Sequence, residues 1–134
     1  MTVKFNIVER GRPGHSEVPK KYYPSIQSTG RVSIRQLAER ASDMSTLSTA
    51  DMMAAIEILL VIIPDELAHG NIVELGDFGN FWLRSSAEGV EDIARVRGDL
   101  ITTLLPRFNP GKRFKRTLAT IQFKKLRRKV RKIS

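Results

Sequence analysis

The lysines and arginines near the C-terminus are the residues whose type and spacing indicate a chemistry most clearly. The 134-residue chain has a net charge of +9, but residues 1–106 contain 11 Lys and Arg against 14 Asp and Glu. Residues 107–134 contain 12 Lys and Arg and no acid. Such a one-sided charge attracts polyanions, of which nucleic acid is the commonest. The alternative is a solvated tail that only aids solubility.

Two basic segments lie in this region. The sequence KRFKRTL at residues 112–118 predicts a short helix with Phe114 and Leu118 facing inward at i, i+4 and its cations facing outward. The first amides of such a helix also favour a phosphate. A second basic run, KKLRRKVRK at residues 124–132, is compatible with a helix or with a disordered tail that condenses on DNA.

Residues for catalysis or metal binding are not arranged in any recognisable pattern. His15 and His69 have no metal-site spacing, and residues 76–79 lack the lysine of a phosphate-binding loop. The chain has no cysteine, and its longest apolar run, residues 58–63, is far too short to span a bilayer. We therefore expect a soluble cytoplasmic protein that is not an enzyme and uses no cofactor, metal, membrane or small-molecule substrate.

The stretch GNIVELGDFGNFWL at residues 70–83 is central to the organisation of the chain. Its alternating apolar residues predict one half-buried strand, in which Gly76 and Gly79 allow a bend. A polar segment at residues 84–99 and a return strand at residues 100–108 complete a long hairpin, which the sequence NPG then ends.

Two helices are predicted before this strand. Ser33 and Gln36 match a capping box that starts a helix of about ten residues. A second helix starts at Ser48, ends at Gly70 and is apolar well beyond one stripe. Pro64 should kink this helix near its last turn, or the helix stops at residue 63. A helix apolar on all sides needs a cover, and a second copy of the chain is the simplest one.

The chain also has a short strand pattern at each end. Residues 2–9 alternate Val3, Phe5 and Ile7 with the intervening residues, and a loop rich in Gly, Pro and charge follows. Residues 21–23 resume an extended pattern. We expect residues 120–124 to pair with residues 3–7, because each is a short strand without a local partner.

The sequences GDFGNF and FNPGK (residues 108–112), with the helical stretch before them, resemble the HU/IHF family of bacterial DNA-bending proteins across residues 33–118. The sequence KKYY at residues 20–23 resembles the longer HU-related variant, which has an N-terminal extension.

The resemblance implies an α+β fold: an intertwined homodimer with a helical body and a three-stranded antiparallel sheet that extends into a β-hairpin arm, plus an extra N-terminal strand. Its implied divisions are an N-terminal extension (1–32), an HU-like DNA-binding domain (33–119) and a short strand with a basic tail (120–134). The expected dimer core is formed by Ile56, Leu59, Leu60, Ile63, Leu67, Phe78, Phe81 and Phe108.

The implied function is an architectural, largely sequence-independent double-stranded DNA-binding protein of the nucleoid, acting as a homodimer. The expected DNA contacts are Arg84, Arg95, Arg97, Arg107, Lys112, Arg113, Lys115, Arg116, Lys124, Lys125, Arg127, Arg128 and Lys129. The alternative is a protein-interaction or assembly module on an HU-like scaffold, since fold alone does not set function. RNA binding is a third possibility, although the chain lacks an aromatic stacking platform.

The arm differs from the family pattern. Short members carry a proline at the arm tip that wedges between base pairs, whereas this chain has no proline between Pro64 and Pro106. Val90 or Ile93 is a possible apolar substitute. Four acids that would repel phosphate lie in the same segment: Glu88, Glu91, Asp92 and Asp99.

Overall fold

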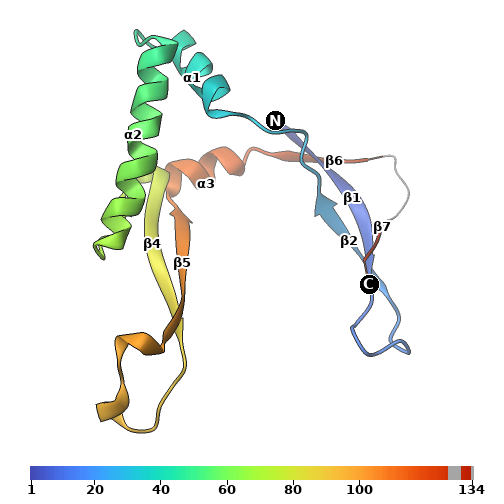
Figure 1. The fold of residues 1–134 in the computed structure, drawn as a ribbon. Coiled ribbons are helices and arrows are strands. Elements are labelled where there is room, and N and C mark those ends of the chain that lie inside the picture. Colours follow the sequence, from blue (N-terminus) through green and yellow to red (C-terminus); the bar gives the residue numbers. More distant parts are fainter. Residues whose placement is uncertain (127–130, 134) are drawn as a thin grey trace. The chain divides into compact units, whose positions relative to one another are not determined.

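A computed structural model describes residues 1–126 and 131–133. The chain divides into two compact units, which are shown in Figure 1 and described separately below. Unit 1 combines Met1–Val32 with Thr117–Ser134, and unit 2 comprises Ser33–Arg116. Unit 2 is mixed α and β, as predicted for the HU-like domain.

Unit 2 begins with the two predicted helices, α1 (Ile34–Asp43) and α2 (Thr49–Ala68). The capping box is confirmed: the Gln36 amide donates to Ser33 Oγ at 3.2 Å, and the Ser33 amide donates to Gln36 Oε1 at 2.8 Å. Ser48 caps α2 by accepting a hydrogen bond from the Asp51 amide at 3.1 Å. Both helices therefore start where their capping residues predict.

The end of α2 decides between the two sequence-based alternatives. The helix continues through Pro64 to Ala68, so the alternative that it stops at residue 63 is wrong. Gly70 has φ +85°, and the amides of Gly70 and Asn71 donate to the carbonyls of Leu67 and Glu66 at 3.0 and 3.1 Å. These bonds satisfy carbonyls that the helix end leaves unpaired, and the positive φ explains the glycine.

The stretch at residues 70–83 is a hairpin and not the single bent strand predicted above. It consists of β3 (Val73–Glu74), a 3₁₀ turn η1 (Gly76–Phe78) and the start of β4 (Gly79–Ala87), with Val73 opposite Phe81. The strand prediction failed here because Gly76 adopts φ +58° and reverses the chain, a conformation that residue alternation does not reveal.

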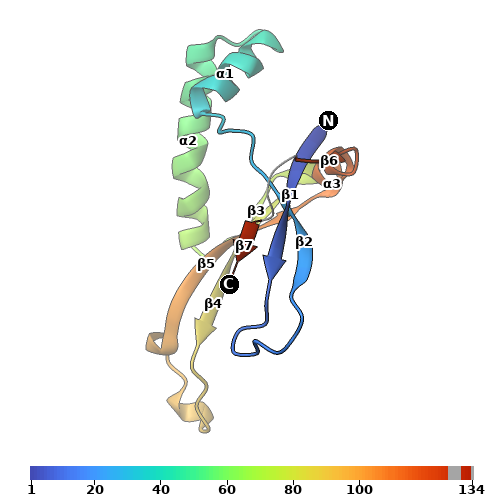
Figure 2. The same cartoon turned by 90° about the vertical axis from the view of Figure 1, so that its right-hand side faces the viewer.

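Strand β5 (Ile101–Pro110) completes the predicted three-stranded antiparallel sheet, in the order β3-β4-β5. It runs two residues past Phe108, so the predicted break at NPG comes too early; Pro110 still pairs with Gly79 at the sheet edge. Figures 1 and 2 show the β4–β5 hairpin projecting past the C-terminal end of α2. Its far end contains two further 3₁₀ turns, η2 (Ile93–Arg95) and η3 (Gly98–Leu100).

The glycine-rich turn and the FNPGK segment pack against each other. The Gly111 amide donates to the Phe78 carbonyl at 2.9 Å, and a Cβ on Gly111 would collide with the Asp77 carbonyl oxygen. Around this contact, the rings of Phe78, Phe81, Phe108 and Phe114 lie 4.9–5.4 Å apart between centroids. The two motifs that carry the resemblance thus pack against each other, and we call this packed contact around Gly111 the joint.

Helix α3 (Lys112–Leu118) follows directly after this joint, with the predicted bounds. Phe114 faces inward as expected, because it contacts the rings of Phe78 and Phe108. The prediction for Leu118 is wrong for the single chain, in which this side chain is half exposed.

Unit 1 is a small sheet around β1 (Thr2–Arg10), which pairs antiparallel with β2 (Lys21–Ile26) and parallel with β6 (Gln122–Lys125) and β7 (Arg131–Ile133). The predicted pairing of the two chain ends is confirmed. Strand β2 is longer than expected and contains Pro24, which an edge strand tolerates because one side of it needs no amide donor. A helix or a disordered tail was considered for residues 124–132; the described parts of that run belong instead to strands β6 and β7.

Burial within β1 differs from the alternation noted in the sequence. Val8 and Asn6 are buried, whereas Val3, Phe5 and Ile7 are only half-buried. The Asn6 Oδ1 accepts a hydrogen bond from the Ile7 amide at 2.9 Å.

The single chain buries very little apolar surface. In the part of the chain that the structure describes, the buried hydrophobic residues are Val8, Ala38 and Leu67. Five consecutive residues at the middle of α2, from Ile58 to Ile62, are 46–71% exposed. Exposed apolar surface of this extent is characteristic of a chain that associates with another.

Candidate nucleic-acid interface

Helix α3 holds four of the predicted contact residues. Lys112, Arg113, Lys115 and Arg116 are all exposed. With 3.6 residues per turn, Lys112 and Arg116 lie on the side of the helix opposite Phe114, and Arg113 and Lys115 lie on its two flanks; the Phe114 ring packs into the aromatic cluster. The joint at Gly111 therefore fixes the direction in which these four cations point.

The paired strands of the arm bring two more predicted residues together. Arg107 lies directly opposite Trp82, and Arg84 is two residues further along β4. Because side chains alternate between faces along a strand, Arg84, Trp82 and Arg107 share one face of the hairpin. Both arginines are exposed. The opposite face carries Phe81 and Phe108, so over this length both arginines lie on the face away from the two phenylalanines, together with Trp82 and Leu105; we call it the basic face of the arm.

The arm tip is chemically mixed. Arg95 ends η2 and Arg97 precedes η3, where its Nε lies 3.8 Å from Asp99 Oδ1. Asp92 caps η2 by accepting a hydrogen bond from the Ala94 amide at 3.0 Å. Ile93 is 89% exposed. The tip therefore presents two arginines together with acids and an apolar side chain.

The two lysines of β6 lie on different faces of the sheet. Lys124 lies opposite Lys4 and Lys125 opposite Phe5, so the two lysines belong to opposite faces of the unit 1 sheet. The predicted contacts Arg127, Arg128 and Lys129 lie outside the described residues.

The residues predicted for the dimer core occupy the apolar surface of unit 2. Leu59 and Leu60 are half exposed on α2, Ile56 and Ile63 are half-buried, and Leu67 is buried. The other three belong to the aromatic cluster: Phe78, Phe81 and Phe108.

The positive charge is concentrated in unit 1. Unit 1 contains 13 Lys and Arg and two acids, whereas unit 2 contains 10 Lys and Arg and 12 acids. The sequence alone predicts no binding role for Lys4, Arg10, Arg12 or Lys21, because these cations are scattered along an N-terminal segment that also contains acids. The signal that could have identified these residues was the predicted pairing of the two chain ends.

Two negative findings concern the described residues alone. No group of three or more His, Cys, Asp or Glu side chains is placed to hold a metal ion. No helix in this part of the chain combines the length and apolar character that crossing a membrane requires.

Comparison with known proteins gives a match over most of the chain. Residues 1–125 match the HU-HIG family, described as an HU domain fused to a wHTH, Ig or glycine-rich motif. The chain belongs to the HU-HIG family. The match confirms the predicted HU relationship and includes the N-terminal extension, which the short HU proteins lack.

Two individual relatives agree with this assignment. The DNA-binding protein HU of Thermus thermophilus is 30% identical over 81 residues, which is 59% of this chain and 84% of that protein. A solved structure of a candidate bacterial DNA-binding protein from Bacteroides vulgatus ATCC 8482 has a TM-score of 0.64 at 12% identity. That similarity covers 93% of this chain and 48% of the other, so this chain spans about half the length of that protein, and the similarity shows the fold alone.

Proposed function

We propose that this protein is an architectural double-stranded DNA-binding protein of the bacterial nucleoid, in the cytoplasm, that acts as a homodimer and binds largely without regard to sequence. The observation that carries the proposal is the basic face of the arm, where Arg84 and Arg107 are exposed on paired strands that project from unit 2. The relative from Thermus thermophilus, named as a DNA-binding protein, supports it.

The homodimer is supported by the exposed middle of α2. Fully burying one Leu, Ile or Val side chain contributes about 1.5–3 kcal/mol. The exposed fractions of Ile58 to Ile62 add up to almost three such side chains per protomer. A two-fold axis lets the same surface cover itself, and both copies then gain this stabilisation.

The binding mechanism rests on phosphate contacts. Arginine and lysine displace condensed counterions from the duplex, which makes affinity fall steeply with salt. With six to ten such contacts, affinity falls by about 10³- to 10⁵-fold between about 50 and 200 mM salt. Contacts of this kind position a protein on DNA without identifying bases. In this proposal residues 33–119 form the DNA-binding domain, and Lys124 and Lys125 add charge from the C-terminal segment.

The test is a pair of matched double variants. R84Q/R107Q removes two charges from the basic face of the arm, and R35Q/R40Q removes two from α1, where both arginines are exposed. Binding to random-sequence duplex is titrated against salt by gel shift or fluorescence anisotropy. The arm variant should lower the slope of log K against log salt by about 1.8 per protomer in contact. The α1 variant should leave the slope unchanged.

Two results would contradict the proposal. One is wild-type protein that does not bind duplex at low salt, or binds it without salt dependence. The other is equal slopes for the two double variants, which would show that the arm face is no more involved than α1.

A second candidate function is a protein-interaction or assembly module, and the arm tip favours it. Ile93 is 89% exposed and Val96 is 64% exposed, beside Glu91 and Asp92. Replacing Ile93 and Val96 by serine discriminates between the functions. Loss of partner binding with unchanged DNA affinity would support the module, whereas loss of DNA affinity would support a tip that contacts the duplex.

A further inference from the structure

The charge surplus of the whole chain resides in unit 1. Its 13 basic residues and two acids give a net charge of +11, whereas unit 2 has a net charge of −2. Cations of unit 1 could therefore add phosphate contacts to those that the arm and α3 are proposed to make. The positions of these cations in the folded sheet therefore matter for DNA binding.

The strand register places four of the cations of unit 1 together. On β1, Lys4 and Arg10 are six positions apart, an even number, and so lie on the same face. Lys124 of β6 pairs with Lys4, and Lys21 of β2 pairs with Arg10. All four cations therefore share one face of the sheet and are exposed. We call this the cationic face; no acidic residue occupies its paired positions among the residues described.

The opposite face of the sheet is mainly apolar. It carries Val3, Phe5 and Ile7 from β1, Tyr22 and Ile26 from β2, and Phe123 and Lys125 from β6. Its one acid among the described positions, Glu9, lies 4.0 Å from Lys20 Nζ. On the cationic face the apolar β1 residue is Val8, which is buried. Among the described positions of β1, β2 and β6, the cationic face thus carries four exposed cations and no acid, whereas the opposite face carries Lys125 as its cation beside mainly apolar side chains.

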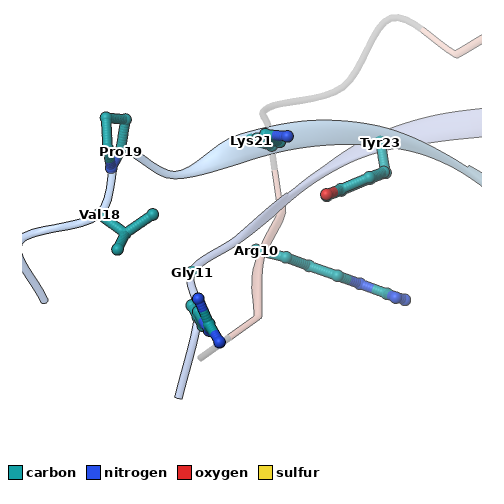
Figure 3. Close-up of a pocket in the computed structure, with 7 residues that line it drawn as sticks. Arg10, Gly11, Val18, Pro19, Lys21 and Tyr23 are labelled. Carbon is teal, nitrogen blue, oxygen red and sulfur yellow. The ribbon is translucent and has the colours of Figure 1, made fainter. Parts of the chain in front are cut away.

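One end of the cationic face is hollowed. Arg10, Arg12, Lys21 and Tyr23 line a groove of about 570 Å³, which the loop residues Val18 and Pro19 help to close. Figure 3 shows Arg10 and Tyr23 on neighbouring strands among the residues that line this groove. The Arg10 guanidinium carbon lies 5.9 Å from the centre of the Tyr23 ring. This contact favours one orientation of the guanidinium while its donors remain open to a ligand.

We propose that the cationic face binds the phosphate backbone of double-stranded DNA, as a contact separate from the arm; the inference rests on the proposed function and extends it. Arg10 lies six positions along β1 from Lys4, which corresponds to about 20 Å. The Lys4–Lys124 pair and the Arg10–Lys21 pair lie at the two ends of the face, so the distance between them matches the length of about six base pairs. The N-terminal extension and the C-terminal strand act here as one binding surface.

Duplex DNA fits this face better than the other polyanions. A protein partner would favour an apolar centre with few charges, and the accessible apolar residues lie on the other face. Single-stranded nucleic acid would favour several exposed aromatic rings, whereas this face has Tyr23 as its aromatic residue among the paired positions described.

The experiment compares two double variants of the full chain. R10Q/K21Q removes the cross-strand pair at the groove, and K20Q/R31Q removes the same charge from unit 1 at positions outside the cationic face. Salt titrations with random-sequence duplex are run as for the arm variants, and urea unfolding checks that each variant folds. R10Q/K21Q should lower the salt slope by about 1.8 per protomer in contact and weaken binding about 30-fold at about 0.15 M salt. K20Q/R31Q should match wild type.

The outcomes separate this inference from the proposed function. If wild type binds duplex and both double variants bind like wild type, the cationic face is not a DNA contact and the inference fails, while the arm proposal stands. The inference is also overturned if R10Q/K21Q loses affinity for single-stranded RNA or for an acidic protein but not for duplex. If R10Q/K21Q does not fold, K4Q/K124Q at the other end of the face gives the same comparison, with the same expected loss.

Discussion

Replacing Gly111 by alanine tests whether the joint at Gly111 fixes the position of α3. A Cβ at this position would meet the carbonyl oxygen of Asp77, which belongs to the backbone and cannot rotate away. Gly98 provides a matched control, because nothing lies within 4 Å of the position that an alanine Cβ would take there, and neither glycine has a positive φ. Both substitutions remove one glycine from the unfolded chain, so that effect cancels in the comparison.

The difference between the two variants follows from two contacts. Forcing an extra methyl group into a packed site costs about 1–3 kcal/mol. Displacing Gly111 also weakens its 2.9 Å hydrogen bond to the Phe78 carbonyl, which contributes about 0.5–1.5 kcal/mol. G111A should therefore be less stable than G98A by about 1.5–4.5 kcal/mol.

Urea unfolding followed by circular dichroism measures this difference. Protein concentration must be held fixed, because the stability of an associating chain depends on it. G111A should also bind DNA more weakly, since the shift displaces Lys112 and the cations that follow it. Equal unfolding midpoints and slopes for G111A and G98A would refute the proposed role of the glycine.

Three further predictions test the dimer, the first helix and the arm tip. L60E places a charge on the exposed middle of α2 and should shift the protein from dimer to monomer in sedimentation velocity; an unchanged dimer would exclude this surface. S33A removes the cap of α1 and should lower the free energy of unfolding by about 1 kcal/mol in urea titrations, whereas no change would show that the capping box is not stabilising. E88Q/E91Q removes two acids from the arm tip and should raise duplex affinity at low salt; unaltered affinity would place the tip away from DNA.

Local signals in the sequence predicted most elements of the fold. Ser33 with Gln36 and Ser48 with Asp51 located both helix starts, because a cap depends only on residues within one turn. The bounds of α3 and the pairing of the chain ends were also correct. These features follow from short-range hydrogen bonding or from the need of a lone strand for a partner.

Features that depend on tertiary packing were not predicted. The reversal at Gly76 depends on backbone conformation, and the inward position expected for Leu118 assumed a neighbour that a single chain does not supply. The same holds for β1, where Asn6 is buried although its residue type favours exposure. Periodicity identifies an element but not which of its faces other segments cover.

The candidate site was predicted in part for a similar reason. The residue types of α3 and the arm identified exposed cations, and the β4–β5 register then placed Arg84 and Arg107 on one face. The grouping of Lys4 and Arg10 with Lys124 required the register of β1 with β6 and β2, which composition does not contain.

The most direct test of the account is the mass of the purified protein by sedimentation equilibrium, measured without DNA at micromolar concentration. A chain that buries so little of its apolar surface should sediment with twice the 15.1 kDa mass of one copy. A stable, cooperatively folded species with the mass of a single copy would contradict the shared core on which the homodimer proposal depends.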